Sequence, residues 1–404
     1  MRISLLSIFP ESFDSFRQSS VIRKAEKNGM LQLDVTDIRD YAEGSFRKID
    51  DSPYGGGPGM VLRVDTVSKA IASVRGEKTR VVLLSPKGAR FDQKKAHEYA
   101  GFEHLVLVCG HYEGFDARVS NYVDEELSIG DFILTGGEIA AMAVCDSVVR
   151  LLDGTLREGS AEDESFETGF LEYPHYTHPY EFDGNKVPDV LLSGNDAEIF
   201  LWRQKQAIID TIRFRPDLFE KMAGQGIGCS DSKILFFRDS VLKIQTIGAE
   251  SKRELDAMIW LKSRLPVPDV LYHEAKDGKS YLLMSRLRGR MLCDPLILHN
   301  RNRLMKTAAA ALKMLWSVDI SDCPFRGDAP SGSVLSHGDF CLPNVFADNK
   351  GITGFIDLGL CTVTSRNADI ETCIESLEAN LTGRFSDGTP EPPFDRDIFL
   401  ELLQ

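Results

Sequence analysis

The feature that most constrains the fold of this sequence is a glycine-interrupted apolar stretch at residues 128–138, which leads directly into a helical pattern. Glycines between a strand and a helix let backbone amides approach a ligand closely. Two similar stretches lie upstream, at residues 84–88 and 109–114, and each follows an apolar strand candidate. Three such loops predict one pocket, formed at a single edge of a sheet.

The bulk composition is that of a globular protein with more than one domain. The 404 residues are too many for one compact core, and 43% of them are apolar and 27% charged. No apolar run reaches membrane-spanning length, the N-terminus has no signal-peptide pattern, and the eight cysteines form no C-x-x-C pair. We therefore expect a cytoplasmic protein without membrane spans, disulfides or a zinc site. The net charge of −14 does not favour a polyanion partner, so an RNA site would have to be local.

The first 150 residues alternate strand and helix patterns. Strands are predicted at residues 3–8, 31–37, 81–85, 105–109 and 132–135, and helices at residues 12–27, 66–73, 93–100 and 137–152. This alternation favours an α/β domain with a mainly parallel sheet. Residues 53–60 contain four glycines and two prolines, which predicts a loop.

The remainder of the chain changes character twice. A polar, irregular stretch follows residue 152, and a helical block at residues 195–214 then mixes aromatic with basic side chains. After a glycine-rich linker candidate, the sequence predicts strands at residues 233–238, 241–246 and 280–285, and helices at residues 251–264 and 303–317. We predict four parts: a domain at 1–160, a flexible segment with a helical subdomain at 161–221, a linker at 222–228 and a second domain at 229–404.

The motifs of the first part resemble those of bacterial tRNA (guanine-N1-)-methyltransferases. The resemblance covers about residues 1–220 and rests on residues 53–60, 109–114, 128–138, 173–177 and 191–195. It implies a trefoil-knotted α/β fold of the SPOUT class with a helical tRNA-binding extension. It also implies methyl transfer from S-adenosyl-L-methionine to N1 of the guanosine directly 3′ of the anticodon. The implied partners are tRNA and a second copy of the chain, because the family's active site is shared between two subunits.

The resemblance assigns site residues that suit this chemistry. Methyl transfer to guanine N1 needs a base for the N1 proton and a positive group for the charge that develops at O6. The family's arginine falls on Arg150, and its carboxylate falls on Glu164, with Asp163 as the alternative. The implied contacts to the methyl donor, mostly through the backbone, are Pro86, Gly110, Tyr112, Glu113, Gly114, Ile129, Gly130, Leu134, Gly136 and Gly137.

The second domain carries the spacing of a kinase catalytic loop. Residues 337–344 read His-Gly-Asp-Phe-Cys-Leu-Pro-Asn, which fits H-x-D-x4-N, and an Asp-Leu-Gly triplet follows where a D-F-G site belongs. Asp339 would accept the proton of the attacking hydroxyl, and Asn344 and Asp357 would hold Mg²⁺. Upstream, Lys243 fits the lysine that holds the ATP phosphates, with Glu254 as its partner on the next helix, and we expect both residues to belong to the nucleotide site.

The details of this domain resemble aminoglycoside 3′-phosphotransferases over about residues 228–404. Only eleven residues separate Pro324 from Ser336, where that family carries a long helical insert, so we expect an α+β kinase-like fold with a shortened C-lobe. One hypothesis is a bifunctional enzyme whose second domain phosphorylates a small-molecule hydroxyl. A second hypothesis makes this domain a non-catalytic nucleotide-binding or regulatory module. In a third, the first domain methylates another RNA or a small molecule.

Overall fold

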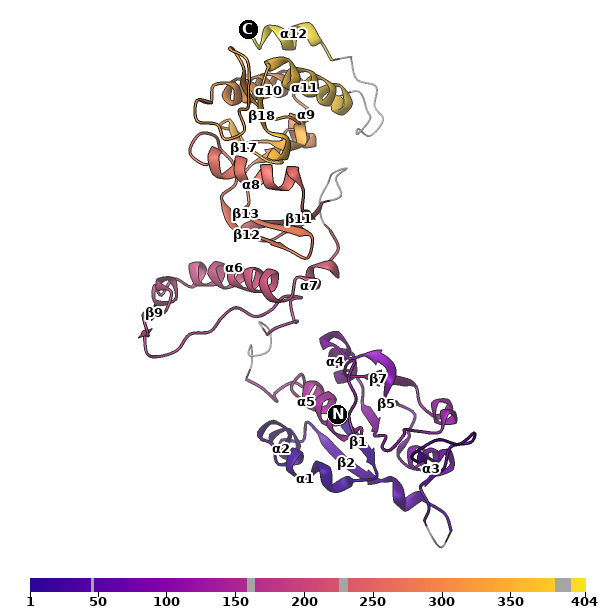
Figure 1. The fold of residues 1–404 in the computed structure, drawn as a ribbon. Helices are drawn as coiled ribbons and strands as arrows, with labels where there is room; N and C mark the ends of the chain where they lie inside the picture. The colour runs from indigo at the N-terminus through magenta and orange to yellow at the C-terminus, as the bar shows by residue number, and fades with distance from the viewer. Residues whose placement is uncertain (45–46, 158–163, 225–231, 382–393) are drawn as a thin grey trace. The chain divides into compact units, whose positions relative to one another are not determined.

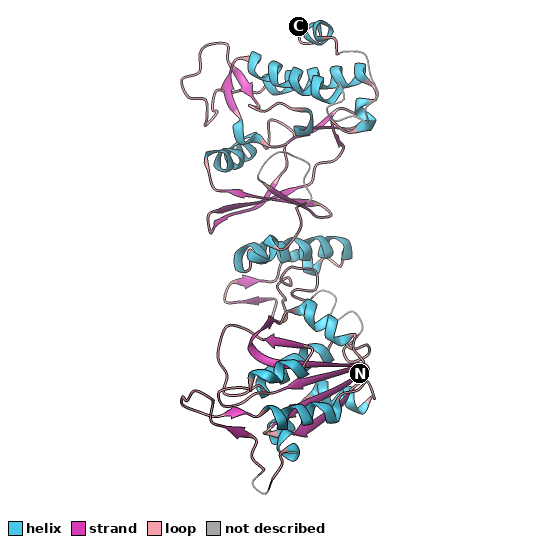
Figure 2. Ribbon diagram, turned by 90° about the vertical axis from the view of Figure 1, so that its right-hand side faces the viewer, coloured by secondary structure: helices cyan, strands magenta, loops and turns pink. Residues whose placement is uncertain are grey.

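The structure is a computed structural model that describes residues 1–44, 47–157, 164–224, 232–381 and 394–404 (Figures 1 and 2). The chain divides into two compact units, Met1–Glu172 and Tyr173–Gln404. None of the helices in these ranges combines the length and apolarity needed to cross a bilayer.

The first unit is built on a five-stranded parallel sheet with the strand order β2-β1-β6-β5-β7. Its strands are β1 (Arg2–Ser7), β2 (Gln32–Asp37), β5 (Thr79–Arg90), β6 (His104–Val108) and β7 (Glu125–Ser128). The central strand β6 is buried throughout, and its alternate side chains enter the cores on opposite faces of the sheet. The expectation of an α/β domain with a parallel sheet is confirmed.

One predicted strand is wrong. Residues 132–135 form no strand, and the last strand of the sheet is β7, which ends at Ser128. Because β7 is an edge strand, it tolerates charged side chains such as Glu125 and is not a continuous apolar run. The apolar run was therefore the misleading signal, since Phe132 and Ile133 are exposed in the following loop.

Helices cover both faces of this sheet (Figure 1). One face carries α1 (Asp14–Arg17), α2 (Ser20–Lys27), α4 (Gln93–Ala100) and α5 (Glu138–Val149), and the other carries α3 (Val64–Val74) with the 3₁₀ segments η2 (Ile38–Tyr41) and η3 (Ala117–Tyr122). The helix predicted at residues 12–27 is broken, because Ser19 is extended and η1 (Pro10–Phe13) precedes α1. The loop at residues 53–60 is confirmed, and it joins β3 (Asp50–Asp51) to β4 (Val61–Leu62).

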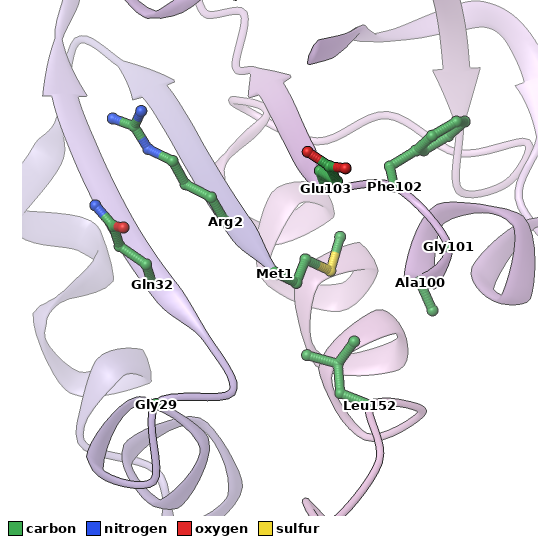
Figure 3. Close-up of a pocket in the computed structure, with 9 residues that line it drawn as sticks. All are labelled: Met1, Arg2, Gly29, Gln32, Ala100, Gly101, Phe102, Glu103 and Leu152. Carbon is green, nitrogen blue, oxygen red and sulfur yellow. The ribbon is translucent and has the colours of Figure 1, made fainter. Parts of the chain in front are cut away.

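An open pocket of about 530 Å³ lies at the amino ends of these strands (Figure 3). It is lined by Met1, Arg2, Gly29, Gln32, Ala100, Gly101, Phe102, Glu103 and Leu152. The glycine-bearing loops follow the carboxyl ends of the strands, which is the edge where parallel sheets bind ligands. This pocket is therefore not the site that the sequence predicts.

The second unit begins with the helical segment. It contains β8 (Glu181–Phe182), β9 (Asn185–Lys186), η4 (Asp189–Leu192), α6 (Asp196–Phe214) and α7 (Asp217–Glu220). This segment packs on the sheet that follows it: Phe219 is fully buried against the ring of Tyr281, and Lys276 Nζ donates a hydrogen bond of 2.6 Å to Arg213 O. The helical segment and the sheet therefore belong to one compact unit.

That sheet is antiparallel, with the order β10-β11-β13-β12. Its strands are β10 (Lys233–Phe236), β11 (Ser240–Thr246), β12 (Val270–Lys276) and β13 (Lys279–Ser285), and α8 (Ala249–Leu261) connects β11 to β12. The strands predicted at residues 233–238 and 241–246 are confirmed, as is the helix that follows them.

The rest of the unit surrounds one large apolar core, to which α8, α10 and α11 contribute side chains. Its helices are α9 (Pro295–Leu298), α10 (Arg301–Trp316), α11 (Arg366–Leu381) and α12 (Arg396–Glu401), with the 3₁₀ segments η5 (Leu342–Asn344) and η6 (Leu358–Leu360). Its short strands are β14 (Arg290–Met291), β15 (Val334–Ser336), β16 (Val345–Ala347), β17 (Ile352–Phe355) and β18 (Thr362–Thr364).

Candidate functional site

Two of the predicted glycine loops meet at the carboxyl edge of the parallel sheet. Gly137 N donates a hydrogen bond of 2.8 Å to Gly110 O, and His111 and Gly136 form an isolated β-bridge. A Cβ on Gly137 would lie 2.8 Å from Cys109 Cα, which is too close for any side chain. Glycine is therefore required here for the two backbones to approach each other.

The third predicted loop, at residues 84–88, is part of a strand in the structure. Strand β5 continues through residues 84–89 with an irregular register, so Pro86 lies within the strand and not in a loop after it. A Cβ on Gly88 would lie 2.2 Å from Leu127 N, so this part of β5 packs directly on β7. Ile129 and Leu134, which follow β7, are partly buried against the core below.

The loop at residues 53–60 meets the same group of residues. Glu113 N donates a hydrogen bond of 3.0 Å to Met60 O, and Leu62 N donates one of 2.9 Å to Gly114 O. Tyr112 has a positive φ of 60° and is 48% exposed, and the Glu113 carboxylate is also exposed. The edge thus presents closely spaced backbone groups beside the exposed residues Tyr112 and Glu113.

The candidate base lies elsewhere in the unit. Arg150 caps the C-terminus of α5, and its Nη2 donates a hydrogen bond of 2.6 Å to Glu164 Oε1. Asp163, the alternative base, lies outside the described residues. Gly137 caps the other end of α5, and a helix of 12 residues is about 18 Å long. Within one chain, the glycine loops and the Arg150–Glu164 pair are therefore at opposite ends of α5.

The second unit contains a charged triad, in which Lys243 and Glu254 are buried and the Asp357 side chain is 43% exposed. Lys243 Nζ donates hydrogen bonds to both carboxylate oxygens of Glu254, at 3.0 and 2.8 Å, and to Asp357 Oδ1 at 2.7 Å. Burial lowers the pKa of Lys243, but the attraction of both carboxylates outweighs it, so the pKa lies above its ordinary value. Burial raises the pKa of Glu254, against the pull of the lysine charge. The triad places one permanent positive charge beside Asp357.

The predicted catalytic loop lies next to this triad. Asn344 Nδ2 donates hydrogen bonds of 3.1 Å to both the backbone oxygen and Oδ2 of Asp339. Ile356 N donates one of 3.0 Å to Asn344 O, which brings the loop beside Asp357. Asp357 adopts a left-handed backbone with φ of 59°. Asn344 and Asp357 offer oxygen ligands of the kind that Mg²⁺ prefers; no cluster of three His, Cys, Asp or Glu suited to a metal occurs in the described ranges.

One residue that supports this loop, Asp369, is not among those predicted from the sequence. Asp369 on α11 is buried, and its Oδ1 accepts hydrogen bonds from Ser336 Oγ at 2.8 Å and from His337 N at 3.0 Å. Its Oδ2 accepts one of 3.1 Å from Trp316 Nε1. Burial lowers the pKa of His337, and its Nε2 donates a hydrogen bond of 2.9 Å to Ile356 O. In the sequence, the only sign of this role is that Asp369 is an acidic residue on the apolar side of a helix.

Comparison with known proteins assigns the first half of the chain. Residues 1–221 match the family described as tRNA (Guanine-1)-methyltransferase TrmD. The chain belongs to the tRNA (guanine-1)-methyltransferase family. Residues 235–332 and 328–391 match the phosphotransferase enzyme family, so this methyltransferase-family chain also carries a kinase-like domain.

Curated relatives agree with this assignment. A tRNA (guanine-N(1)-)-methyltransferase of Listeria innocua is 52% identical over 226 residues, which are 54% of this chain and 92% of the relative. Proteins of the same name from Malacoplasma penetrans and Dictyoglomus turgidum are each 49% identical, over 55% of this chain and 98% and 91% of their own lengths. The match covers nearly the whole length of each relative and leaves out the kinase-like domain of this methyltransferase-family member.

We predict that Asp369→Asn destabilises the second unit by about 3 kcal/mol, because an amide cannot accept from all three donors and one buried donor is left unpaired. Urea unfolding followed by tryptophan fluorescence measures this, since the three tryptophans, Trp202, Trp260 and Trp316, all lie in this unit. Adding Trp316→Phe removes one donor and should recover part of the loss. An unchanged midpoint in Asp369→Asn would contradict the assignment.

Proposed function

We propose that this chain transfers a methyl group from S-adenosyl-L-methionine to N1 of the guanosine directly 3′ of the anticodon in tRNA. The observation that carries this proposal is the meeting of the loops at Gly110 and Gly137 in a member of this family. The names of the curated relatives support the same reaction and substrate.

The carboxyl edge suits such a donor. Backbone approach as close as that at Gly137 leaves amides and carbonyls within reach of an adenosine, and the exposed Glu113 carboxylate suits a cationic ligand. The residues that would hold the donor are Pro86, Gly110, Tyr112, Glu113, Gly114, Ile129, Gly130, Leu134, Gly136 and Gly137. When bound, the donor supplies the electrophilic methyl group.

Arg150 and Glu164 would perform the proton and charge chemistry. Glu164 accepts a hydrogen bond from one Arg150 nitrogen, which leaves other guanidinium N–H groups to bind the guanine O6. A carboxylate oriented in this way can take the N1 proton while the arginine stabilises the charge on O6. Asp163 stays the alternative base.

The active site would be shared between two copies of the chain. Because α5 separates the glycine loops from Arg150 by about 18 Å, one chain cannot bring both to the same guanine. Phe132, Ile133 and Ile139 are 54%, 82% and 58% exposed near the glycine end of α5, and an apolar surface of this kind favours a protein partner. A symmetric dimer would cover this surface and supply the second half of the site.

The helical segment is the proposed tRNA-binding part. Arg203 on α6 lies 4.7 Å from the ring centre of Tyr173 and is exposed, and Lys205 follows it on the same helix. Basic and aromatic side chains together suit phosphates and unstacked bases. A guanosine in a stem-loop must leave its stack before its N1 can be reached.

The kinase-like domain would phosphorylate a small-molecule hydroxyl with ATP. Asp339 would accept the hydroxyl proton, and Lys243, held by Glu254, would bind the phosphates. Asn344 and Asp357 would hold Mg²⁺, which neutralises phosphate charge when bound. The complete triad and catalytic loop favour catalysis over a non-catalytic module.

Three finer features belong to this proposal: a trefoil knot in the first unit, a shortened C-lobe and a cytoplasmic location. The close passage of Gly88 beside β7 supports the knot, and residues 317–333 contain no helix or strand, which supports the short lobe. The cysteines of the described ranges are all free, as in a reducing compartment. Tracing the chain in a crystal structure and fractionating cells would test these features.

We predict that Arg150→Ala and Glu164→Gln each lower kcat for tRNA methylation by about 100-fold or more, because each removes a group that acts in the transition state. The measurement is transfer of a labelled methyl group to tRNA transcripts with G or A after the anticodon, of which only the first should react.

Asp163→Asn is the matched control for Glu164→Gln and should keep kcat within about threefold. If Asp163→Asn is the inactive variant instead, the base is Asp163. Wild-type rates in Arg150→Ala would refute the proposed role of the arginine.

We predict that two inactive variants complement each other. Gly137→Ala blocks the glycine loops, while Arg150→Ala leaves them intact. If each site uses residues of both copies, co-expression of the two variants should restore about one quarter of the wild-type rate, since half of the dimers then hold one intact site. If the two co-expressed variants together are as inactive as each variant alone, the result would argue against a shared site.

We predict that Asp357→Asn weakens binding of Mg²⁺ with a non-hydrolysable ATP analogue by about tenfold or more. The reason is that Asp357, which is both the proposed metal ligand and a partner of Lys243, loses its charge. Titration calorimetry on the full chain measures the affinity. Asp348→Asn, on an exposed turn nearby, should bind like wild type. Equal affinities for both variants would remove Asp357 from the nucleotide site.

A further inference from the structure

A cluster of three polar side chains, two of them buried and the third partly exposed, lies at the glycine loops. Ser7 Oγ donates a hydrogen bond of 2.6 Å to Glu138 Oε1, and both residues are buried. Glu138 Oε2 lies 3.9 Å from His111 Nδ1. None of the proposed chemical steps uses these three residues.

The cluster connects β1 with the loop after β6 and the start of α5, which are three of the elements around the proposed pocket. Ser7 ends β1, His111 is on the loop after β6, and Glu138 is the first residue of α5, immediately after Gly137. The free amides at the N-terminus of a helix favour a carboxylate at this position. The Glu138 carboxylate therefore contacts the sheet through Ser7 and lies between the two glycine loops.

His111 lacks one of its hydrogen bonds. Its Nδ1 is buried and has no partner among the described residues, and an unpaired polar atom in such a place is costly. The ring is held edge-on by Phe9, at a centroid distance of 4.8 Å. A shift of about 1 Å would bring Nδ1 within hydrogen-bond distance of the Glu138 carboxylate.

We propose that Glu138 is a positioning residue for the methyl-donor pocket, which acts through His111 to fix the backbone of both glycine loops. This inference rests on the proposed function, because the pocket is the one assigned to S-adenosyl-L-methionine. Glu138 does not touch the guanine in this scheme. Its side chain sets the distance between Gly110 and Gly136, on whose backbones the donor would lie.

The same two strands offer a matched control. Ser4 Oγ and His104 Nε2 form a buried hydrogen bond of 2.9 Å between β1 and β6, near the amino ends of the strands. This pair resembles Ser7 and His111 in its chemistry but is remote from the glycine loops. Ser4→Ala therefore reports what the loss of a buried serine–histidine contact does to stability alone.

The test measures binding of S-adenosylhomocysteine to the full chain by titration calorimetry, together with the melting temperature. Glu138→Met keeps the length of the side chain without its oxygens, and His111→Phe keeps the ring without Nδ1. Each should weaken binding by about tenfold, and the double variant should bind no more weakly than the weaker single variant, since both changes break one connection. Ser4→Ala should lower the melting temperature and bind within about twofold of wild type.

The other possible outcomes each contradict a different part of the proposal. Multiplied losses in the double variant would show that Glu138 and His111 act separately. Equal losses in Ser4→Ala and Glu138→Met would make the effect one of general stability. If wild type itself fails to bind S-adenosylhomocysteine, the proposed function fails; if wild type and His111→Phe bind alike, only the positioning role fails. The Michaelis constant for tRNA should stay within about threefold in all variants.

Discussion

The first unit depends on the approach of two backbone segments at the carboxyl edge of its sheet. The hydrogen bond from Gly137 to Gly110 brings the end of β6 against the start of α5 at a distance that no side chain allows. This contact brings the two glycine loops together and also fixes the position at which α5 begins. Since Arg150 caps the other end of α5, the position of this helix also determines where Arg150 and its partner Glu164 lie.

Much of this arrangement follows from the sequence, for definite reasons. Buried parallel strands such as β6 are continuous apolar runs, and glycines mark the points where backbones meet, so both could be predicted. The edge strand β7 could not, because two of its four residues are glutamates, which interrupt the apolar run. The Ser7–Glu138 contact also leaves no sequence signal, since it joins residues 131 positions apart and has no periodicity. The same holds for Asp369, whose partners come from other elements.

The two candidate sites use opposite physical means. The edge of the first unit presents mainly uncharged backbone groups, with a few polar side chains beside them. The second unit concentrates fixed charges around Lys243, where two carboxylates hold an ammonium in a buried position. The buried pair of Lys243 and Glu254 needs both members, because removal of either one removes a charge that the other depends on.

The packing of Phe219 on the kinase-like sheet has a consequence for synthesis of the protein. Phe219 leaves the ribosome about 60 residues before Tyr281, the ring against which it packs. At roughly 5–20 residues per second, the Phe219 side chain stays without that cover for several seconds. During this interval the nascent chain presents a hydrophobic site for chaperones, although the whole of the first unit has already been synthesised.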